Sequence, residues 1–166
     1  MAIVKCYFLR HGIAVESEAW SGSDFDRPLT RDGRSRMERE AKAIAELELD
    51  LDCIVSSPLL RAKQTAEILA DRLDMRDKLL EDARLGGSFD LERLRAILAA
   101  HAGAASIALV GHEPSMSMTI GHAIGSAGIE LKKAALAGVE FVSDSSATGT
   151  LICLIPPKVL VTLGKR

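Results

Sequence analysis

The amino-acid sequence predicts a three-layer α/β/α sandwich with a mostly parallel central sheet and an antiparallel strand near the C-terminus. Through most of the chain, short apolar runs typical of buried strands alternate with longer segments whose apolar residues recur at helical spacing. Near the C-terminus, two apolar runs are separated only by a segment rich in Ser, Asp, Thr and Gly, as in a β-hairpin. Strands that alternate with helices form parallel sheets covered on both faces, whereas a hairpin adds an antiparallel strand.

The first strand and the first helix are predicted in the N-terminal third. The run Ile3–Leu9 is apolar and rich in β-branched and aromatic residues, which favours a buried strand. The polar residues 15–28 are expected to form a loop. Thr30 is suited to cap a helix, and apolar residues at helical spacing predict that this helix ends near Leu49.

A second strand and a second helix are predicted next. Cys53–Ser56 is a short apolar strand, and Ser57 followed by Pro58 is typical of an N-cap with proline in the first helical turn. This start places Arg61 in the first turn of the helix. The apolar face of that helix comprises Ala62, Ala66, Leu69 and Leu73.

The second half of the chain predicts two further helices and three strands. Apolar residues at helical spacing from Leu91 to Leu98 indicate a helix, and Ser106–Val110 is a buried strand. Pro114 is expected to open another helix. The two runs Gly138–Val142 and Thr150–Ile155 are expected to pair as the closing hairpin.

The composition is that of one folded domain, residues 1–166. Hydrophobic residues make up 48% and charged residues 27%, which permits a core and argues against disorder. The net charge of −2 argues against a nucleic-acid partner, and no apolar run resembles a membrane span or a signal peptide. Cys6, Cys53 and Cys153 lack a metal-binding spacing, so we expect buried thiols, no metal and a cytoplasmic protein.

Reactive polar side chains follow three of the predicted strands. The first strand ends in Arg10-His11, the second is followed by the helix that carries Arg61, and the third is followed by Gly111 and His112. Ligands of open α/β sheets bind beyond the carboxyl ends of the strands. Two histidines and two arginines are therefore expected to meet in one crevice.

This set of side chains favours phosphoryl chemistry. The planar guanidinium of arginine matches the oxygens of a phosphoryl group and stabilises their charge in the transition state. A neutral imidazole can attack phosphorus, and the neighbouring arginines favour the neutral form of His11. No metal is required, since the arginines supply the positive charge.

Three motifs of the chain contain these arginines and histidines, and a fourth lies between the first two. The four are Leu9-Arg10-His11-Gly12, Pro28-Leu29-Thr30-Arg31-Asp32-Gly33, Ser56-Ser57-Pro58-Leu59-Leu60-Arg61-Ala62-Lys63-Gln64-Thr65-Ala66 and Gly111-His112-Glu113-Pro114. These motifs resemble those of the histidine phosphatase superfamily, and within it the short SixA-type phosphohistidine phosphatases. They occur in the family's order and cover most of the chain.

The resemblance implies a role for each of the four central residues. His11 matches the nucleophile that becomes phosphorylated during the reaction. Arg10 and Arg61 match the phosphate-binding arginines, and His112 matches the second histidine that contacts the phosphoryl group. The resemblance also implies that no metal or organic cofactor takes part.

Many members of the superfamily use a carboxylic acid to protonate an alcohol leaving group, and its position in this sequence is ambiguous. Glu81 and Asp82, after the second helix, are the main candidates, and Asp24, Asp26 and Glu113 are weaker ones. Without such an acid, phosphate esters would react slowly. Phosphohistidine needs less help because imidazole is a better leaving group than an alkoxide.

The short chain also bears on the substrate. Short loops after the first two strands would leave an open site that admits a phosphorylated side chain of another protein, for example a histidine phosphotransfer domain. Arginines near the first helix could steer an acidic partner. Because they alternate with Glu38 and Glu40, we expect instead a solvated helix face.

Two other functions are compatible with the same residues. The first is a small-molecule phosphatase of this superfamily that cleaves phosphate esters with Glu81 or Asp82 as general acid. The second is a non-catalytic module that binds a phosphorylated ligand. The presence of both histidines beside both arginines argues against a pure binding module.

Overall fold

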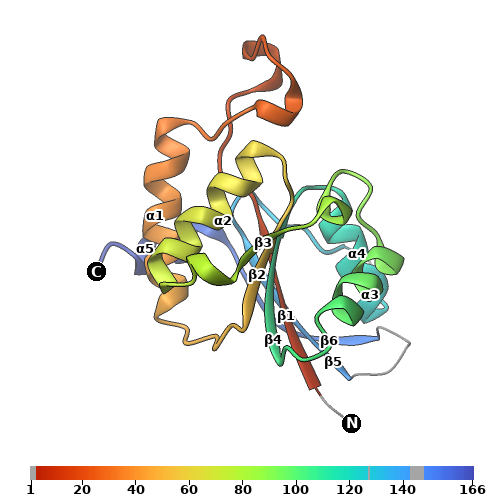
Figure 1. Cartoon of the computed structure of the whole chain (residues 1–166). Helices are drawn as coiled ribbons and strands as arrows, with labels where there is room; N and C mark the ends of the chain where they lie inside the picture. Colours follow the sequence, from red (N-terminus) through yellow and green to blue (C-terminus); the bar gives the residue numbers. More distant parts are fainter. Residues whose placement is uncertain (1–2, 127, 143–147) are drawn as a thin grey trace.

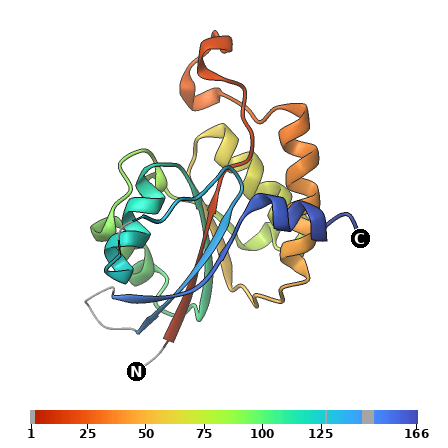
Figure 2. The same cartoon turned by 180° about the vertical axis from the view of Figure 1, so that it is seen from behind.

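The computed structural model describes residues 3–126, 128–142 and 148–166. The strands are β1 (Ile3–Arg10), β2 (Cys53–Ser56), β3 (Leu79–Glu81), β4 (Ser106–Gly111), β5 (Leu136–Val142) and β6 (Gly149–Ile155). The helices are α1 (Arg31–Ala45), α2 (Leu60–Leu73), α3 (Leu91–Ala100), α4 (Ser115–Ile124) and α5 (Pro157–Leu163). Figures 1 and 2 show that these helices cover both faces of the sheet. Within the described ranges, no helix has the length and apolar character needed to cross a membrane.

The strand directions confirm the predicted fold class. The sheet has the order β3-β2-β4-β1-β5-β6. Pairing is parallel from β3 through β2 and β4 to β1, whereas β5 is antiparallel to both β1 and β6. The predicted hairpin is thus formed by β5 and β6. The Ser/Asp/Thr/Gly turn predicted between them falls on residues 143–147, which lie outside the described residues.

A hydrophobic core lies on each face of the sheet, and β1 contributes to both. Successive side chains of a strand point to opposite faces. Cys6 and Phe8 join the cluster that contains α3 and α4, whereas Tyr7 and Leu9 join the cluster that contains α1, α2 and α5. Because β1 is buried on both sides, its sequence is a continuous apolar run without alternation.

The starts of the first two helices differ in how well they were predicted. Thr30 caps α1 as expected, since its Oγ1 accepts a hydrogen bond from Gly33 N at 2.9 Å. The predicted N-cap Ser57 is wrong, because Leu59 is the N-cap residue and α2 starts only at Leu60. The hydroxyl of Ser57 is instead bonded to Leu59 N and to His112.

Three other predictions need correction. The helix expected to end near Leu49 ends at Ala45, and Glu48 beyond it has a left-handed φ of 49°. Neither β3, which has three residues, nor α5, which begins at the second of two consecutive prolines, was predicted from the sequence. Glu40 does not lie on a solvated face, because its side chain is buried in the packing of α1.

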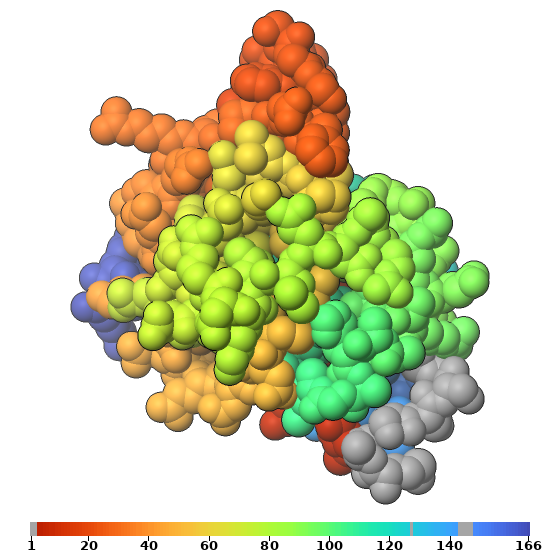
Figure 3. Space-filling model, viewed as in Figure 1, coloured from red at the N-terminus to blue at the C-terminus, as the bar shows by residue number. Residues whose placement is uncertain are grey.

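The segment predicted as a loop after β1 contains two short 3₁₀ turns, Ser17–Ala19 and Asp24–Asp26. We call residues 15–28 the excursion. Its stem is closed by a bridge between Ala14 and Leu29 and by a hydrogen bond from Thr30 N to Ile13 O. In the space-filling view the excursion stands out from the rest of the molecule next to α2 (Figure 3).

Candidate active site

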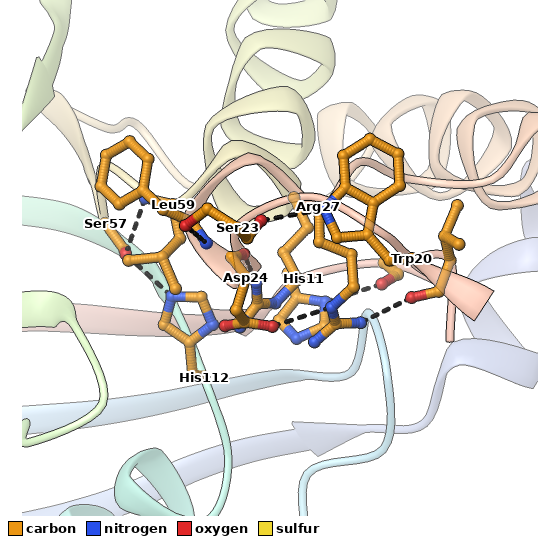
Figure 4. Close-up of polar contacts among 12 residues, drawn as sticks. His11, Trp20, Ser23, Asp24, Arg27, Ser57, Leu59 and His112 are labelled. Carbon is orange, nitrogen blue, oxygen red and sulfur yellow. Dashed lines mark hydrogen bonds and ion pairs between the residues drawn. The ribbon is translucent and has the colours of Figure 1, made fainter. Parts of the chain in front are cut away.

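Three neighbouring strands bring the two predicted histidines together. Arg10 on β1 is opposite Gly111 on β4, and His11 N donates a hydrogen bond to Gly111 O at 3.0 Å. On the other side of β4, Ser57 N bonds to Val110 O at 2.9 Å. As a result, the rings of His11 and His112 have centroids 5.3 Å apart. Figure 4 shows His11 and His112 together with Asp24 and Arg27 at this end of the sheet.

The environment of His11 fixes its tautomer and its charge. Its Nδ1 lies 2.7 Å from Gly12 O, and because a carbonyl oxygen only accepts, Nδ1 must carry the proton. The neutral ring therefore keeps a lone pair on Nε2. Burial, together with the guanidinium charges of Arg61 and Arg10, lowers the pKa of His11 to about 3.

His112 is held by a serine hydroxyl. Its Nε2 lies 2.8 Å from Ser57 Oγ, which also accepts a hydrogen bond from Leu59 N. If the Ser57 hydroxyl donates to Nε2, the proton of the neutral ring is on Nδ1, a buried nitrogen with no hydrogen-bond partner in the described residues. Burial and the nearby Arg61 lower the pKa of His112 to about 4, so this ring is neutral as well.

Arg61 enters the site from the first turn of α2, as the sequence predicted. Its side chain is 8% exposed. Nη1 donates to the backbone oxygen of Asp24 at 2.9 Å, and Nη2 donates to the Asp24 carboxylate at 3.1 Å. Its Nε is buried and has no hydrogen-bond partner in the part of the chain that the structure describes.

Arg10 is held from the segment before β5. Its Nη1 donates to Leu131 O at 2.9 Å, while its buried Nε has no hydrogen-bond partner within the described ranges. The backbone of Leu131 is fixed in turn, because Leu131 N bonds to Ser117 Oγ and that hydroxyl donates to Glu113 at 2.5 Å. The weak acid candidate Glu113 thus supports the position of Arg10.

Thr65 and Gly33 are parts of the site's scaffold that the sequence analysis missed. Thr65 Oγ1 accepts from Gly12 N at 3.0 Å and donates to Arg61 O at 2.7 Å, so it joins the loop after His11 to α2. A Cβ on Gly33 would lie 2.0 Å from Ile13 O, which explains why α1 can pass close to that loop. A threonine four residues after the arginine was a signal for the first of these contacts.

The two main general-acid candidates are engaged elsewhere. Glu81 pairs with Lys63 at 2.5 Å. Asp82 accepts hydrogen bonds from both the backbone N–H and the guanidinium of Arg84. These bonds lower the pKa of Asp82. Both residues lie at the β3 edge, separated from β1 by β2 and β4.

Among the weaker candidates, only Asp24 lies at the site. Its carboxylate bonds to Arg27 Nε at 2.9 Å as well as to Arg61, and these arginines lower its pKa. Asp24 is therefore a stable anion rather than a proton donor. Asp26 lies exposed on the same 3₁₀ turn.

The site as a whole is a largely buried cluster of two positively charged arginines and two neutral histidines. Two guanidinium groups cannot lose their charge near neutral pH, so the cluster favours an anion. In the part of the chain that the structure describes, its buried nitrogens without partners are Arg10 Nε, Arg61 Nε and His112 Nδ1. Over the described ranges, no three His, Cys, Asp or Glu side chains are grouped so that they could hold a metal ion.

Comparison with known proteins places the chain among phosphatases. Residues 6–86 match the model of the histidine phosphatase superfamily (branch 1). An uncharacterised protein of Picosynechococcus is 37% identical over 145 residues, which is 82% of this chain and 84% of that protein. The phosphohistidine phosphatase SixA of Escherichia coli is 29% identical over 113 residues, or 67% of this chain and 68% of SixA. The solved structure of the protein histidine phosphatase SixA complexed with tungstate superimposes with a TM-score of 0.83 at 26% identity, covering 95% of this chain and 99% of that one.

Proposed function

The chain belongs to the histidine phosphatase superfamily and is a phosphatase, and we propose that its substrate is a phosphohistidine side chain on another protein. In the proposed reaction the phosphoryl group passes from the substrate to His11, and water then releases it as inorganic phosphate. The support comes from the site, from its carboxylates and from the likeness to SixA.

The unpartnered nitrogens of the pocket carry the assignment of a phosphoryl site. A buried donor without a partner costs about 1–3 kcal/mol, so such groups are rare in native structures. Within the described residues, three such nitrogens belong to Arg10, Arg61 and His112. An oxyanion that accepts from them would satisfy all three at once. A phosphoryl group has the charge and the number of oxygens that this arrangement requires.

His11 is suited to be the nucleophile. Its Nε2 lone pair is free because the proton is held on Nδ1 by Gly12 O. Attack by Nε2 forms a new N–P bond while the N–P bond of the substrate breaks, and the departing imidazole takes up a proton from water. Arg10 and Arg61 would stabilise the charge on the transferring oxygens, an effect typically worth about 10²–10³ in rate. Water then breaks the bond to His11.

The carboxylates favour phosphohistidine over phosphate esters. An ester needs a proton for its alkoxide, yet Asp82 and Asp24 are stabilised as anions by Arg84, Arg27 and Arg61. A phosphohistidine leaves imidazole behind and makes a weaker demand on an acid. The three cysteines are free thiols, in keeping with the reducing cytoplasm where we propose that the reaction occurs.

A comparison of two substrate classes tests this proposal. The rate of phosphate loss from a histidine-phosphorylated phosphotransfer domain would be compared with the rates for p-nitrophenyl phosphate and phosphoserine. We expect the phosphohistidine protein to react faster, and His11→Ala to abolish its turnover. His122→Ala, which replaces an exposed histidine on α4, is the matched control and should leave the rate unchanged.

Two outcomes would contradict the proposal in different ways. Full activity of His11→Ala would remove His11 from the mechanism. Faster turnover of the esters would indicate the small-molecule phosphatase, and Glu81→Gln and Asp82→Asn would then show which carboxylate supplies the proton.

A further inference from the structure

Asp24 contacts the arginine that the proposed mechanism assigns to the phosphoryl group. Its carboxylate and its backbone oxygen together bind both terminal nitrogens of Arg61, at 3.1 and 2.9 Å. We propose that Asp24 occupies the phosphoryl position of the resting enzyme, and that a phosphoryl group must displace it before reaction. The excursion would then be a lid that an internal anion holds closed. This inference rests on the proposed role of Arg61.

The burial of two unpartnered nitrogens supports the proposed displacement of Asp24 by a phosphoryl group. Arg61 Nε and His112 Nδ1 are buried as well as unpartnered, so a phosphoryl oxygen cannot reach them while the surrounding residues stay in place. Asp24 lies between His112 and Arg27 in the close-up (Figure 4). Its negative charge also acts directly on His112, where it opposes the lowering of the pKa by Arg61. Asp24 is thus among the groups that would have to move.

For electrostatic reasons, the Asp24 carboxylate and a phosphoryl group are alternative ligands of Arg61. A carboxylate and a phosphoryl group use the same N–H donors of a guanidinium. Two anions about 4 Å apart repel each other, and the repulsion grows as water is excluded. A phosphoryl dianion carries more charge than a carboxylate and can contact Arg10, Arg61 and His112 together. It is therefore the stronger ligand for the pocket.

Arg27 provides a partner for Asp24 after its release. Arg27 Nε binds the second carboxylate oxygen of Asp24 at 2.9 Å, and Arg27 Nη1 binds Val15 O at 2.6 Å. All three residues belong to the excursion, so these bonds can move with it. The Asp24 side chain is already 59% exposed. Displacement therefore transfers it to water without leaving a buried, isolated charge.

The attachment of the excursion is consistent with a lid. Neither of its two 3₁₀ turns contributes a buried residue to the core. Beyond the stem, and within the described residues, its ion pairs to the rest of the chain are Asp24 with Arg61 and Glu16 with Lys133. The latter pair spans 3.6 Å between exposed side chains and contributes little. The contact with Arg61 is therefore the main polar restraint on the tip.

Binding of inorganic phosphate, measured by isothermal titration calorimetry, tests the exchange without any turnover. Asp24→Asn removes the competing charge, so we expect it to bind phosphate about two- to fivefold more tightly than the natural protein, as for a partly exposed ion pair. Asp26→Asn changes the same charge on the same turn without a contact to Arg61, and should match the natural protein. Unchanged or weaker binding by Asp24→Asn would overturn the inference, and weaker binding would mean that Asp24 orients Arg61.

Trp20 offers a second measurement, which can be made first on the natural protein. It is the only tryptophan of the chain, and its Nε1 donates to Ser23 O next to Asp24. If the lid opens, phosphate should change the emission of Trp20 or its quenching by acrylamide, with the same Kd as the calorimetric titration. The amplitude should be smaller in Asp24→Asn, in which the lid is already released. If phosphate saturates the protein without changing the emission or the quenching of Trp20, the proposal that the excursion is a lid is wrong.

Arg61→Ala separates failure of this inference from failure of the proposed function. If Arg61→Ala leaves phosphate affinity unchanged, Arg61 is not a phosphate ligand and the proposed site is wrong. If Arg61→Ala loses phosphate binding while Asp24→Asn gains none, the site is right and only the exchange by Asp24 is wrong.

Discussion

Glu40 is a carboxylic acid inside the packing of α1, and replacing it with glutamine tests how the fold tolerates it. The side chain is 1% exposed, and its Oε2 has no hydrogen-bond partner in the described residues. Burial raises the pKa of Glu40 to about 8, against the opposing influence of Arg36. At neutral pH the folded protein therefore holds this carboxyl in its protonated form.

The sign and size of the effect follow from the two pKa values of Glu40. The folded state binds this proton more tightly than the unfolded chain, whose glutamate titrates near 4.5. The contribution to stability is fully present below pH 4.5 and is lost as the pH rises to about 8. At about 1.4 kcal/mol per pH unit, the free energy of unfolding should fall by about 3–4 kcal/mol between pH 5 and pH 8 through this group.

Glu40→Gln removes the titration while it keeps the shape of the side chain. Urea unfolding followed by circular dichroism at pH 5, 6, 7 and 8 would give the free energy of unfolding of both proteins. We expect the advantage of Glu40→Gln over the natural protein to grow by about 1 kcal/mol per pH unit. Glu38→Gln, at an exposed position of the same helix, controls for the charge change. An equal difference at pH 5 and pH 8 would refute the buried protonated state of Glu40.

Three further predictions concern the site. Because the pKa values of His11 and His112 are about 3 and about 4, kcat/KM for a phosphohistidine protein should not fall between pH 8 and pH 5 through protonation of these rings. A fall centred near pH 6.5 would contradict this. Thr65→Val breaks the hydrogen bond that joins Gly12 to α2, together with the bond from Thr65 to Arg61 O, and should lower kcat by about tenfold, a loss expected for about 1–3 kcal/mol of buried hydrogen bonding. An unchanged kcat would show that the loop is fixed by other contacts. Gly33→Ala should lower stability by about 1–3 kcal/mol, since its Cβ would overlap Ile13 O, and a melting temperature equal to that of the natural protein would refute the close approach.

The residues at the strand ends could be predicted because of the geometry of parallel sheets. Arg10 is the last residue of β1, and His11 and His112 come directly after strands that are apolar on both faces, so the chain around them is easy to assign. Parallel neighbours bring their carboxyl ends to one edge. Arg61 could be placed even though its helix begins at Leu60 and not at Pro58, because either start leaves it in the first turn.

The contacts that depend on the path of a long segment could not be predicted. Asp24 and Arg61 are 37 residues apart, and their contact depends on how the excursion turns back over the site. The burial of Glu40 has a similar origin. The periodicity of Met37, Ala41 and Ile44 marks one apolar stripe, but α1 packs against both α2 and α5, and α5 was not predicted. The additional helix widens the buried face beyond the stripe.

One electrostatic constraint connects the nucleophile with the lid. A buried pocket that contains two histidines and two arginines cannot keep four positive charges, because each would be desolvated beside the others. The histidines respond by losing their protons, which leaves His11 with the lone pair that a nucleophile needs. An arginine cannot respond in this way, so Arg61 requires an anion whenever the pocket is closed. In the proposed mechanism, Asp24 meets that requirement at rest and yields it to a phosphoryl group during turnover. The burial that leaves His11 neutral would therefore also make a displaceable counter-ion necessary.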